Sequence, residues 1–510
     1  MKLTRFSAAL GIVAAMATTS CKTDLTGINT NPNSPTSAPA GSLFTNATAT
    51  TVSRFSGVGM TMSGNALFAN HISQVQYLDE DRGHIRATTI DGINGGAYPS
   101  ELEDFEKVKG IGTAAGTASV WGPAAVMQSW VFQNLTDLWG DIPYSAALKG
   151  DVTGGSLTPA YDAQKDIYYG LLKTLTDATT AMRAAPATEA GLSSADVIYK
   201  GDLTKWAKLS NVLRARMALR MSKADAAKAA TELTAAISAG LFTSNADNAA
   251  IAWPGDGIFD NPVAANFATR DDHRVSKTLL DTMVTLADPR VPIFAQPTKW
   301  DPATSAVWAV PANARYIGLQ NGMDNVTVTP FFNTTSRMGT IFYPGATSYG
   351  TFGTATGKKT PSYIATYAEA EFILAECAER GLGGASGAAA HYNNAVTASI
   401  TQWGGSAAAA AAYLAQPGVA YVAGATGLQR IGLQKWISLF TQSSEAWSEW
   451  RRTGNPNTVK MGPKAYPDVL EIPRRWPYPS NELSVNAKNL AAAIARQGPD
   501  LYSTRMWWDK

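Results

Sequence analysis

Apolar side chains recur at helical spacing in several long segments of this chain. Five of them follow one another at offsets of three or four residues: Ile167, Leu171, Leu175, Ala178 and Met182. That spacing places them on one face of an α-helix, because the helix completes a turn in about 3.6 residues. Residues 206–220 repeat the pattern. A helix with one apolar face must bury it, so this chain has to pack helices against one another.

A second helical region lies closer to the C-terminus. Residues 363–380 (YIATYAEAEFILAECAER) predict a helix with a face of small residues, and Gly381 and Gly383 end it. Three positions of the next helix match the second-helix part of the tetratricopeptide pattern: Ala388, Tyr392 and Ala395. A further helix is predicted from about Leu428 to Trp450. The expected fold class is mostly α, a tetratricopeptide-like scaffold of helical pairs with long irregular loops and a few short hairpins.

The middle of the chain, about residues 241–360, has a different character. Gly, Pro, Asn and Thr accumulate there beside many aromatic residues, among them Trp300 and Trp308. Breakers at this density predict irregular loops and short hairpins, and loops on a rigid scaffold are where binding sites concentrate. We therefore expect the two ends of the chain to supply the scaffold and the middle to supply the ligand side.

The N-terminus carries the pattern of an export signal. Lys2 and Arg5 accompany the apolar stretch 6–17 (FSAALGIVAAMA), which is too short to span a membrane as a helix. Small residues then lead to Cys21, as in the lipobox, where cleavage before a cysteine frees it for acylation. We predict a lipoprotein signal peptide over residues 1–20, with an ordinary cleaved signal peptide as the alternative. Acyl chains on Cys21 would hold the protein on a membrane, since each buried CH₂ contributes about 0.8 kcal/mol.

Residues 21–43 form a predicted tether. Much of this segment is rich in Asn, Pro, Ser and Thr and poor in large apolar side chains, so it cannot fold alone. It would space the remaining residues, 44–510, from the membrane surface. We predict that residues 44–510 form a single domain.

The composition excludes several classes of protein. Hydrophobic residues make up 45% of the chain and charged residues 16%, which is typical of a globular protein and not of a disordered one. Lysine and arginine number 42 against 40 acidic residues, so there is no basic footprint for nucleic acid. The only cysteines are Cys21 and Cys377, and with Cys21 acylated no disulfide framework is expected.

Short motifs for metal or cofactor chemistry are missing from the sequence. The four histidines show no HExxH or similar ligand spacing. Residues 357–360 (GKKT) lack both the leading glycine and the hydroxyl residue of a phosphate loop. We therefore expect no cofactor, no metal and no enzymatic activity. A glycoside hydrolase stays open as an alternative, because sequence cannot locate its paired carboxylates in space.

Two clusters of acidic residues occur, within residues 79–81 and 101–104. We interpret both as solvated surface, because runs of charge usually stay hydrated. A calcium site that uses Asp79 and Asp81 is the alternative for the first cluster.

One further carboxylate, Glu371, falls on the small-residue face of its predicted helix. A carboxylate on a helix-packing face is expected to be partly buried and therefore paired with a cation. We predict that its partner is Arg214 or Arg216.

Aromatic residues in polar, breaker-rich contexts are the candidates for ligand binding. A sugar ring presents apolar C–H patches between hydroxyl groups, so an aromatic face flanked by polar side chains can stack on it and hydrogen bond to it. We select Tyr77, Trp300 and Trp308 as ligand contacts, with Asp81, Arg82 and Arg86 as polar partners. Four aromatic residues at helical spacing are instead interpreted as core: Trp436, Phe440, Trp447 and Trp450.

Six phrases in series resemble the SusD/RagB family of nutrient-binding outer-membrane lipoproteins, and especially its SusD-like second subgroup. They are GDIPYSAAL (140–148), YKGDLTKWAKLSNVLRARMALRMS (199–222), YAEAEFILAECAERG (367–381), IGLQKWISLFTQSSEAWSEWRRTGNP (431–456), IPRRWPYPSNELSVNAKNLAAA (472–493) and WWDK (507–510). They occur in order across essentially the whole chain.

The resemblance implies a fold of four tetratricopeptide-like helical pairs with further helices and loops packed on them. It also implies a SusC-like TonB-dependent β-barrel transporter as partner, and a location at the cell surface on the outer membrane, through the lipid anchor. The expected function is capture of oligosaccharide ligands for that transporter. Peptide capture by the same uptake system, or a purely structural helical scaffold, are the alternatives.

Overall fold

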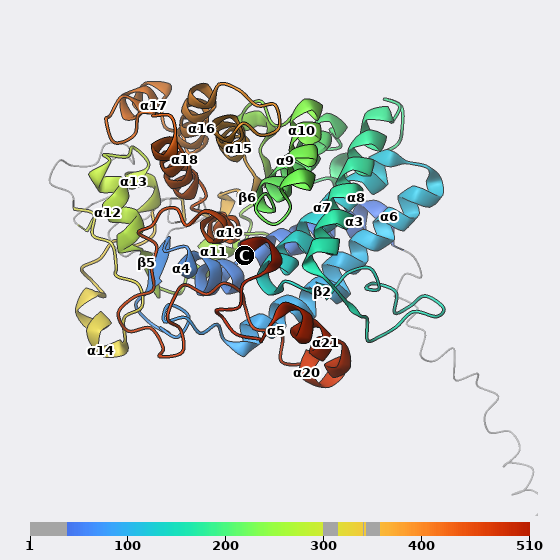
Figure 1. Ribbon diagram of the computed structural model, residues 1–510, viewed down its shortest axis with the longest axis horizontal. Helices are drawn as coiled ribbons and strands as arrows, with labels where there is room; N and C mark the ends of the chain where they lie inside the picture. The colour runs from blue at the N-terminus through green and yellow to red at the C-terminus, as the bar shows by residue number, and fades with distance from the viewer. Residues whose placement is uncertain (1–37, 299–314, 340, 343–356) are drawn as a thin grey trace, which may run out of the picture. The chain divides into compact units, whose positions relative to one another are not determined.

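Helical pairs packed side by side make up most of the molecule. The computed structural model describes residues 38–298, 315–339, 341–342 and 357–510. Figure 1 shows these residues as predominantly helical, as the sequence predicts. Among the described residues, no helix combines the length and apolarity needed to cross a membrane. Residues 40–510 form one compact unit.

The first half of the scaffold consists of long helices in which each packs on the next along the chain. The helices are α3 (Ala40–Ser56), α6 (Glu103–Ala115), α7 (Ala118–Trp139), α8 (Gln164–Ala184), α9 (Leu203–Arg220) and α10 (Ala226–Ala239). Helix α6 packs on α7, α7 on α8, α8 on α9 and α9 on α10, and α3 packs on α6. The apolar faces predicted for residues 167–182 and 206–220 are buried in this stack.

The second half of the scaffold is a further group of helices that contacts the first through α15 and α9. Its members are α15 (Tyr367–Arg380), α16 (Ala388–Gln402), α17 (Ala407–Leu414), α18 (Ala425–Ser438) and α19 (Ser443–Thr453). In the view of Figure 1, α15, α16 and α18 stand next to one another, and α15 packs against both other helices. Gly381 ends α15 in the left-handed conformation, at a φ of 66°.

Two predicted helix boundaries are wrong. The helix expected over 363–380 begins at Tyr367, because residues 362–365 pair as a strand and Thr366 caps the helix through its hydroxyl. The helix expected from Leu428 to Trp450 is two helices, α18 and α19, separated by residues 439–442. The turn between them contains apolar residues and no glycine or proline, so no local sequence signal predicts it.

Short elements fill the region between the two halves. The helices there are α11 (Pro262–Phe267), α12 (Lys277–Thr285), α13 (Val291–Phe294) and α14 (Asn325–Val328). Three antiparallel strand pairs tie distant segments together: β1 (Ile72–Gln74) with β5 (His273–Val275), β2 (Ile142–Pro143) with β3 (Tyr161–Asp162), and β4 (Ala249–Ile251) with β6 (Ser362–Ala365). Further helical segments include α4 (Ala66–Phe68), α5 (Ala87–Gly96), α20 (Glu482–Val485), α21 (Ala487–Gln497) and the π-helical stretches Val58–Asn65 and Ala97–Leu102.

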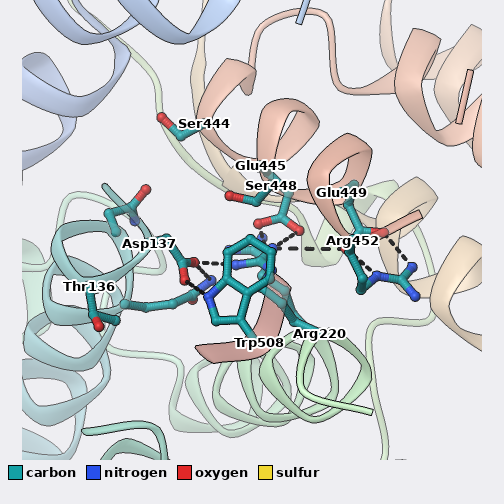
Figure 2. A network of polar contacts seen from close by, with 12 residues as sticks. Thr136, Asp137, Arg220, Ser444, Glu445, Ser448, Glu449, Arg452 and Trp508 are labelled. Carbon is teal, nitrogen blue, oxygen red and sulfur yellow. Dashed lines mark hydrogen bonds and ion pairs between the residues drawn. The ribbon is translucent and has the colours of Figure 1, made fainter. Parts of the chain in front are cut away.

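The aromatic residues predicted to lie in the core do so: Trp436, Phe440, Trp447 and Trp450 are all buried. Beside them lies a network of buried charges, shown in Figure 2. Arg220 bridges Asp137 on α7 and Glu445 on α19. Charges buried this deeply are tolerated only when each is paired and hydrogen bonded, so the network joins the two halves of the scaffold.

The same network extends along α19. Arg452 pairs with Glu376 at 2.6 Å and with Glu449 at 2.7 Å. Burial by itself would raise the pKa of Glu449, but Arg452 and Lys435 outweigh it and hold that pKa well below its usual range. Glu449 is therefore held in the charged form.

The predicted partner of Glu371 is wrong. Glu371 lies 2.7 Å from the ring of His391 on α16, whereas Arg216 pairs with Glu369 and Arg214 with Glu232. Glu369 and Glu371 lie on different sides of α15, and the helix that packs on each side decides the partner.

Candidate functional site

Tyr77 lies on a loop that follows β1 and presents its ring to solvent. Its side chain is 52% exposed, and its backbone is in the left-handed region at a φ of 56°. A tyrosine in that conformation is uncommon and costs about 1 kcal/mol or more, so the surrounding structure must hold it there. Half-exposed aromatic residues fixed in this way are candidates for recognition.

Two guanidinium groups lie over the Tyr77 ring. The central carbon of Arg270 is 4.8 Å from the ring centroid and that of Arg86 is 5.5 Å. Arg270 comes from the segment just before β5, so β1 and β5 together place it beside Tyr77. The site thus combines an aromatic ring with several N–H donors, which is the set of groups that a sugar or another hydroxyl-rich ligand requires.

Each of these guanidinium groups is fixed by one carboxylate. Arg86 lies 2.7 Å from Glu80, and Arg270 lies 2.7 Å from Asp272. Burial raises the pKa of Glu80, and the charge of Arg86 lowers it in part. The hydrogen bond to Asp272 raises the pKa of Arg270. The local charge is therefore balanced, and both guanidinium groups are ordered before any ligand arrives.

Asp81 is buried beneath this loop, at 4% exposure. Its carboxylate accepts hydrogen bonds from the hydroxyl of Ser73 at 2.7 Å, the side-chain amide of Asn321 at 2.7 Å and the backbone N–H of Gly322 at 3.0 Å. It also accepts from the backbone N–H of Gln74 at 3.3 Å. Asp81, selected from the sequence as a ligand contact, is thus placed where it joins three segments and supports the Tyr77 loop.

Arg82 lies at the surface in a row of stacked side chains. Its guanidinium carbon is 4.1 Å from the ring centroid of Tyr466, and its Nε donates to the carbonyl of Lys464 at 2.7 Å. The ring of His84 stacks on two tyrosines of this row. Its centroid lies 4.1 Å from that of Tyr466 and 5.7 Å from that of Tyr502. The row fastens the Tyr77 loop to the C-terminal part of the chain.

Trp300 and Trp308 lie outside the described residues. The residues on either side of their segment are described, and the N–H of Thr298 donates to the carbonyl of Arg315 at 2.7 Å. Further along, the N–H of Leu319 donates to the carbonyl of Val275 in β5 at 2.9 Å. The described chain that follows Trp308 therefore runs beside the strand next to the Tyr77 loop.

The first acidic cluster is not the solvated surface that the sequence predicts. Glu80 and Asp81 are buried and form the contacts given above, and only Asp79 is exposed. In the second cluster Glu101 is buried as well, 2.7 Å from Arg54. Over the described ranges, no three residues of the His, Cys, Asp and Glu types gather as they would around a metal ion.

Sequence reasoning missed Arg270, Tyr466 and Tyr502 as neighbours of the predicted residues. All three lie far from residue 77 along the chain, and single-sequence patterns carry no signal for such contacts. Arg86 was indicated by the sequence as a polar partner, because it follows Tyr77 and Arg82 within a few residues.

The fold is a scaffold of helical pairs, and its ordered loops present an exposed aromatic site with balanced charge. Together these features define the class of a binding protein. A family profile described as "Starch-binding associating with outer membrane" matches residues 32–479. The chain belongs to this SusD-like family. The fold and the family that the sequence suggested are thereby confirmed, and the family is one of outer-membrane-associated binding proteins.

Solved structures share this fold over nearly the whole chain. A chitin-binding protein superposes with a TM-score of 0.79 at 27% identity, covering 92% of this chain and 100% of its own. A SusD homologue from Bacteroides uniformis has a TM-score of 0.76 at 24% identity, with 92% and 99% covered. A chitin-binding SusD homologue from Flavobacterium johnsoniae has a TM-score of 0.75 at 23% identity, with 92% and 98% covered. No curated protein sequence matches the chain significantly.

Proposed function

We propose that this protein captures neutral oligosaccharides at the Tyr77 surface and delivers them to a SusC-like TonB-dependent transporter of the outer membrane. In this proposal acylated Cys21 holds the protein on the cell surface, behind a signal peptide of residues 1–20 and a tether of residues 21–43. Tyr77 and Arg82 contact the ligand together with Trp300 and Trp308, while Asp81 holds the loop. The protein binds its ligand without converting it.

The observation that carries this proposal is the half-exposed Tyr77 ring with two ordered guanidinium groups over it. Each of these two guanidinium groups is already neutralised by a carboxylate, so the pair offers donors for hydroxyl groups without a net charge that would select an ion. Sugar rings bind to such surfaces by stacking of their C–H patches and by hydrogen bonds to their hydroxyl groups. A pre-ordered site also avoids the entropy cost of fixing long side chains on binding.

Chitin-type saccharides are the first ligands to test. The solved structure at 27% identity is that of a chitin-binding protein, and it covers 92% of this chain. Acetamido sugars are neutral and carry both apolar and hydrogen-bonding groups, so they suit an aromatic surface with balanced charge.

Calorimetry on the purified chain without residues 1–21 tests the proposal. Chitohexaose, cellohexaose and maltohexaose are titrated in turn, beside a peptide mixture. We expect Tyr77→Ala to weaken binding of the preferred saccharide by about 1 to 3 kcal/mol, the range for a lost aromatic contact at the centre of a site. Leu157→Ala, which removes an exposed apolar side chain far from the loop in sequence, serves as control. Binding of peptides alone, or turnover of a saccharide, would contradict the proposal.

Anchoring and partnership are tested separately. Mass spectrometry of the protein extracted from membranes should show a lipid-modified Cys21 at the N-terminus, and Cys21→Ser should release the protein from the membrane. Affinity purification of the tagged protein should recover a β-barrel transporter. An unmodified Cys21 in membrane-bound protein would contradict the anchor and leave the ligand proposal standing.

A further inference from the structure

A groove of about 710 Å³ lies between α3 and residues 253–260. Its volume falls within the range of roughly 300 to 1,000 Å³ that is typical of small-molecule sites. The groove shares no residue with the Tyr77 surface. It is therefore a concave feature separate from the proposed ligand site.

The floor of the groove is an uncharged face of α3. Ser42, Asn46, Thr50 and Ser53 lie there at helical spacing. Surface helices usually carry charged residues on the face that points away from the core, but Arg54 is the only charged residue of this 17-residue helix. The result is a floor of hydroxyl and amide groups that can donate and accept hydrogen bonds without adding charge.

The opposite wall is apolar and ends in two exposed side chains. Trp253 is buried in the wall, and its indole N–H donates to the hydroxyl of Ser362 at 2.9 Å. Ile258 is 81% exposed and Phe259 is 52% exposed. The carboxylate of Asp256 accepts hydrogen bonds from the N–H groups of both residues, at 2.9 Å and 2.8 Å. These bonds hold the backbone of the loop that carries Phe259 at the rim of the groove.

The charged groups of the groove are neutralised within the protein. Arg54 lies 2.7 Å from Glu101, and Asp260 lies 2.8 Å from Lys358. A ligand in the groove would thus meet an aromatic rim, hydrogen-bonding groups and no unbalanced charge. The Tyr77 surface has the same combination, and it complements a neutral, hydroxyl-rich molecule better than an ionic one or a purely apolar one.

The groove is linked to the Tyr77 surface along the chain through α11. Asp260 stands just before this helix, and Arg270 follows just after it. A helix of six residues is about 9 Å long, so one short rigid element separates the two sites along the chain. Figure 1 labels α11 near the middle of the view, next to α4.

We propose that the groove between α3 and residues 253–260 is a second saccharide site, which binds a short neutral segment of the same class of glycan as the Tyr77 surface. This inference rests on the proposed function. Two sites on one protein retain a long glycan better than either alone, because the second contact forms at high effective concentration once the first has formed.

The test uses trisaccharides, which are short enough to report on each site. Chitotriose, cellotriose and maltotriose are titrated by calorimetry into the wild type and into variants of each site. Phe259→Ala removes the aromatic side chain at the rim, and Thr50→Trp places a large side chain in the groove. Val152→Ala, at 58% exposure, is the matched control for loss of an exposed apolar side chain. Circular dichroism of each variant reports whether the overall helix content of the protein is kept.

We expect Tyr77→Ala to retain a residual trisaccharide affinity. Adding Phe259→Ala or Thr50→Trp to that variant should weaken this residual binding by about threefold to tenfold, the size of a lost aromatic contact. Groove variants that titrate like the wild type, while Tyr77→Ala loses binding, would overturn the second site and leave the proposed function intact. Groove variants that keep saccharide affinity but no longer recover the transporter would identify the groove as a protein contact, and would also overturn it. A wild type that binds none of the saccharides would overturn both proposals.

Discussion

The scaffold and the Tyr77 surface use arginine in opposite ways. In the scaffold, Arg220 and Arg452 are buried, and each contacts more than one carboxylate from different helices. At the surface, Arg86 and Arg270 are about 40% exposed, at 43% and 42%, and each contacts one carboxylate. The buried pairs join carboxylates on different helices, whereas the surface pairs leave N–H groups and an aromatic ring available.

The difference shows how one kind of interaction can serve two purposes. Removing one partner of a buried ion pair leaves the other charge without solvent or counter-charge, and that costs several kcal/mol. Removing an exposed partner costs little, because water replaces it. A region held by buried ion pairs is therefore rigid and intolerant of substitution. A region with exposed ion pairs can vary in sequence and still fold.

The largest effect is expected at Arg220. Arg220→Ala leaves Asp137 buried without this cation and leaves Glu445 with the longer contact to Arg216, at 3.5 Å, so we expect the free energy of unfolding to fall by about 3–5 kcal/mol. Urea denaturation followed by tryptophan fluorescence measures it. Lys173→Ala, which removes the exposed pair with Asp177, should change the same quantity by less than about 0.5 kcal/mol. Equal effects of the two changes would mean that the network of Figure 2 does not join the scaffold.

A smaller effect is expected at Asp81, where the two regions meet. Asp81→Asn keeps the shape but replaces one acceptor oxygen by a donor, which faces the donors of Ser73, Asn321 or Gly322. We expect the free energy of unfolding to fall by about 1–3 kcal/mol. Saccharide affinity should fall as well, because the loop no longer holds Tyr77.

Hydrogen exchange separates these two consequences of the Asp81 change. Faster exchange confined to residues 72–86 and 319–322 would show that Asp81 supports the loop. Unchanged exchange together with lost affinity would instead make Asp81 a direct ligand contact, as the sequence alone suggests.

Local patterns explain which parts of the fold could be predicted. The helices over 167–182 and 206–220 follow from their own spacing of apolar residues, and the turn at Gly381 follows from a residue type. The break at 439–442 and the strand at 362–365 have no such signal, because packing against other segments decides them.

The candidate site could be predicted only in part for the same reason. Tyr77 stood out because of its polar, breaker-rich context. The sequence could not show that Arg270 lies over its ring, because the pairing of β1 with β5 brings them together. Nor could it separate buried Asp81 from exposed Asp79, since both lie in one acidic run and only the fold distinguishes them. Glu371 shows the same limit, because its helix position predicted burial but not the choice of His391.

Acidification should distinguish the two regions by their carboxylates, and its effect should be the smallest of the three. Arg452 and Arg220 outweigh burial and lower the pKa values of Glu449 and Glu445 below the unfolded value. The stability that these two groups contribute is therefore present above the unfolded pKa and is lost only as the pH falls through the folded values. Burial raises the pKa of Glu80, so Glu80 takes up its proton at a higher pH than they do. Its protonation removes the charge that fixes Arg86 and does not oppose folding, because a raised folded pKa favours the protonated native state.

Saccharide affinity should therefore begin to fall at a higher pH than the one at which the scaffold starts to unfold. We expect a several-fold loss of affinity, about 1 kcal/mol, because an exposed guanidinium loses its one fixed partner while Arg270 keeps its own. Calorimetric titrations and tryptophan fluorescence across the same pH series measure the two transitions. Glu80→Gln should impose the weaker binding at every pH and so reduce the early loss of affinity, with the unfolding transition unchanged. Any loss that remains is assigned to Asp81, whose pKa burial also raises. If affinity and fluorescence change together in the wild type, the surface and the scaffold respond to acid as one unit, and the separation drawn between their ion pairs fails.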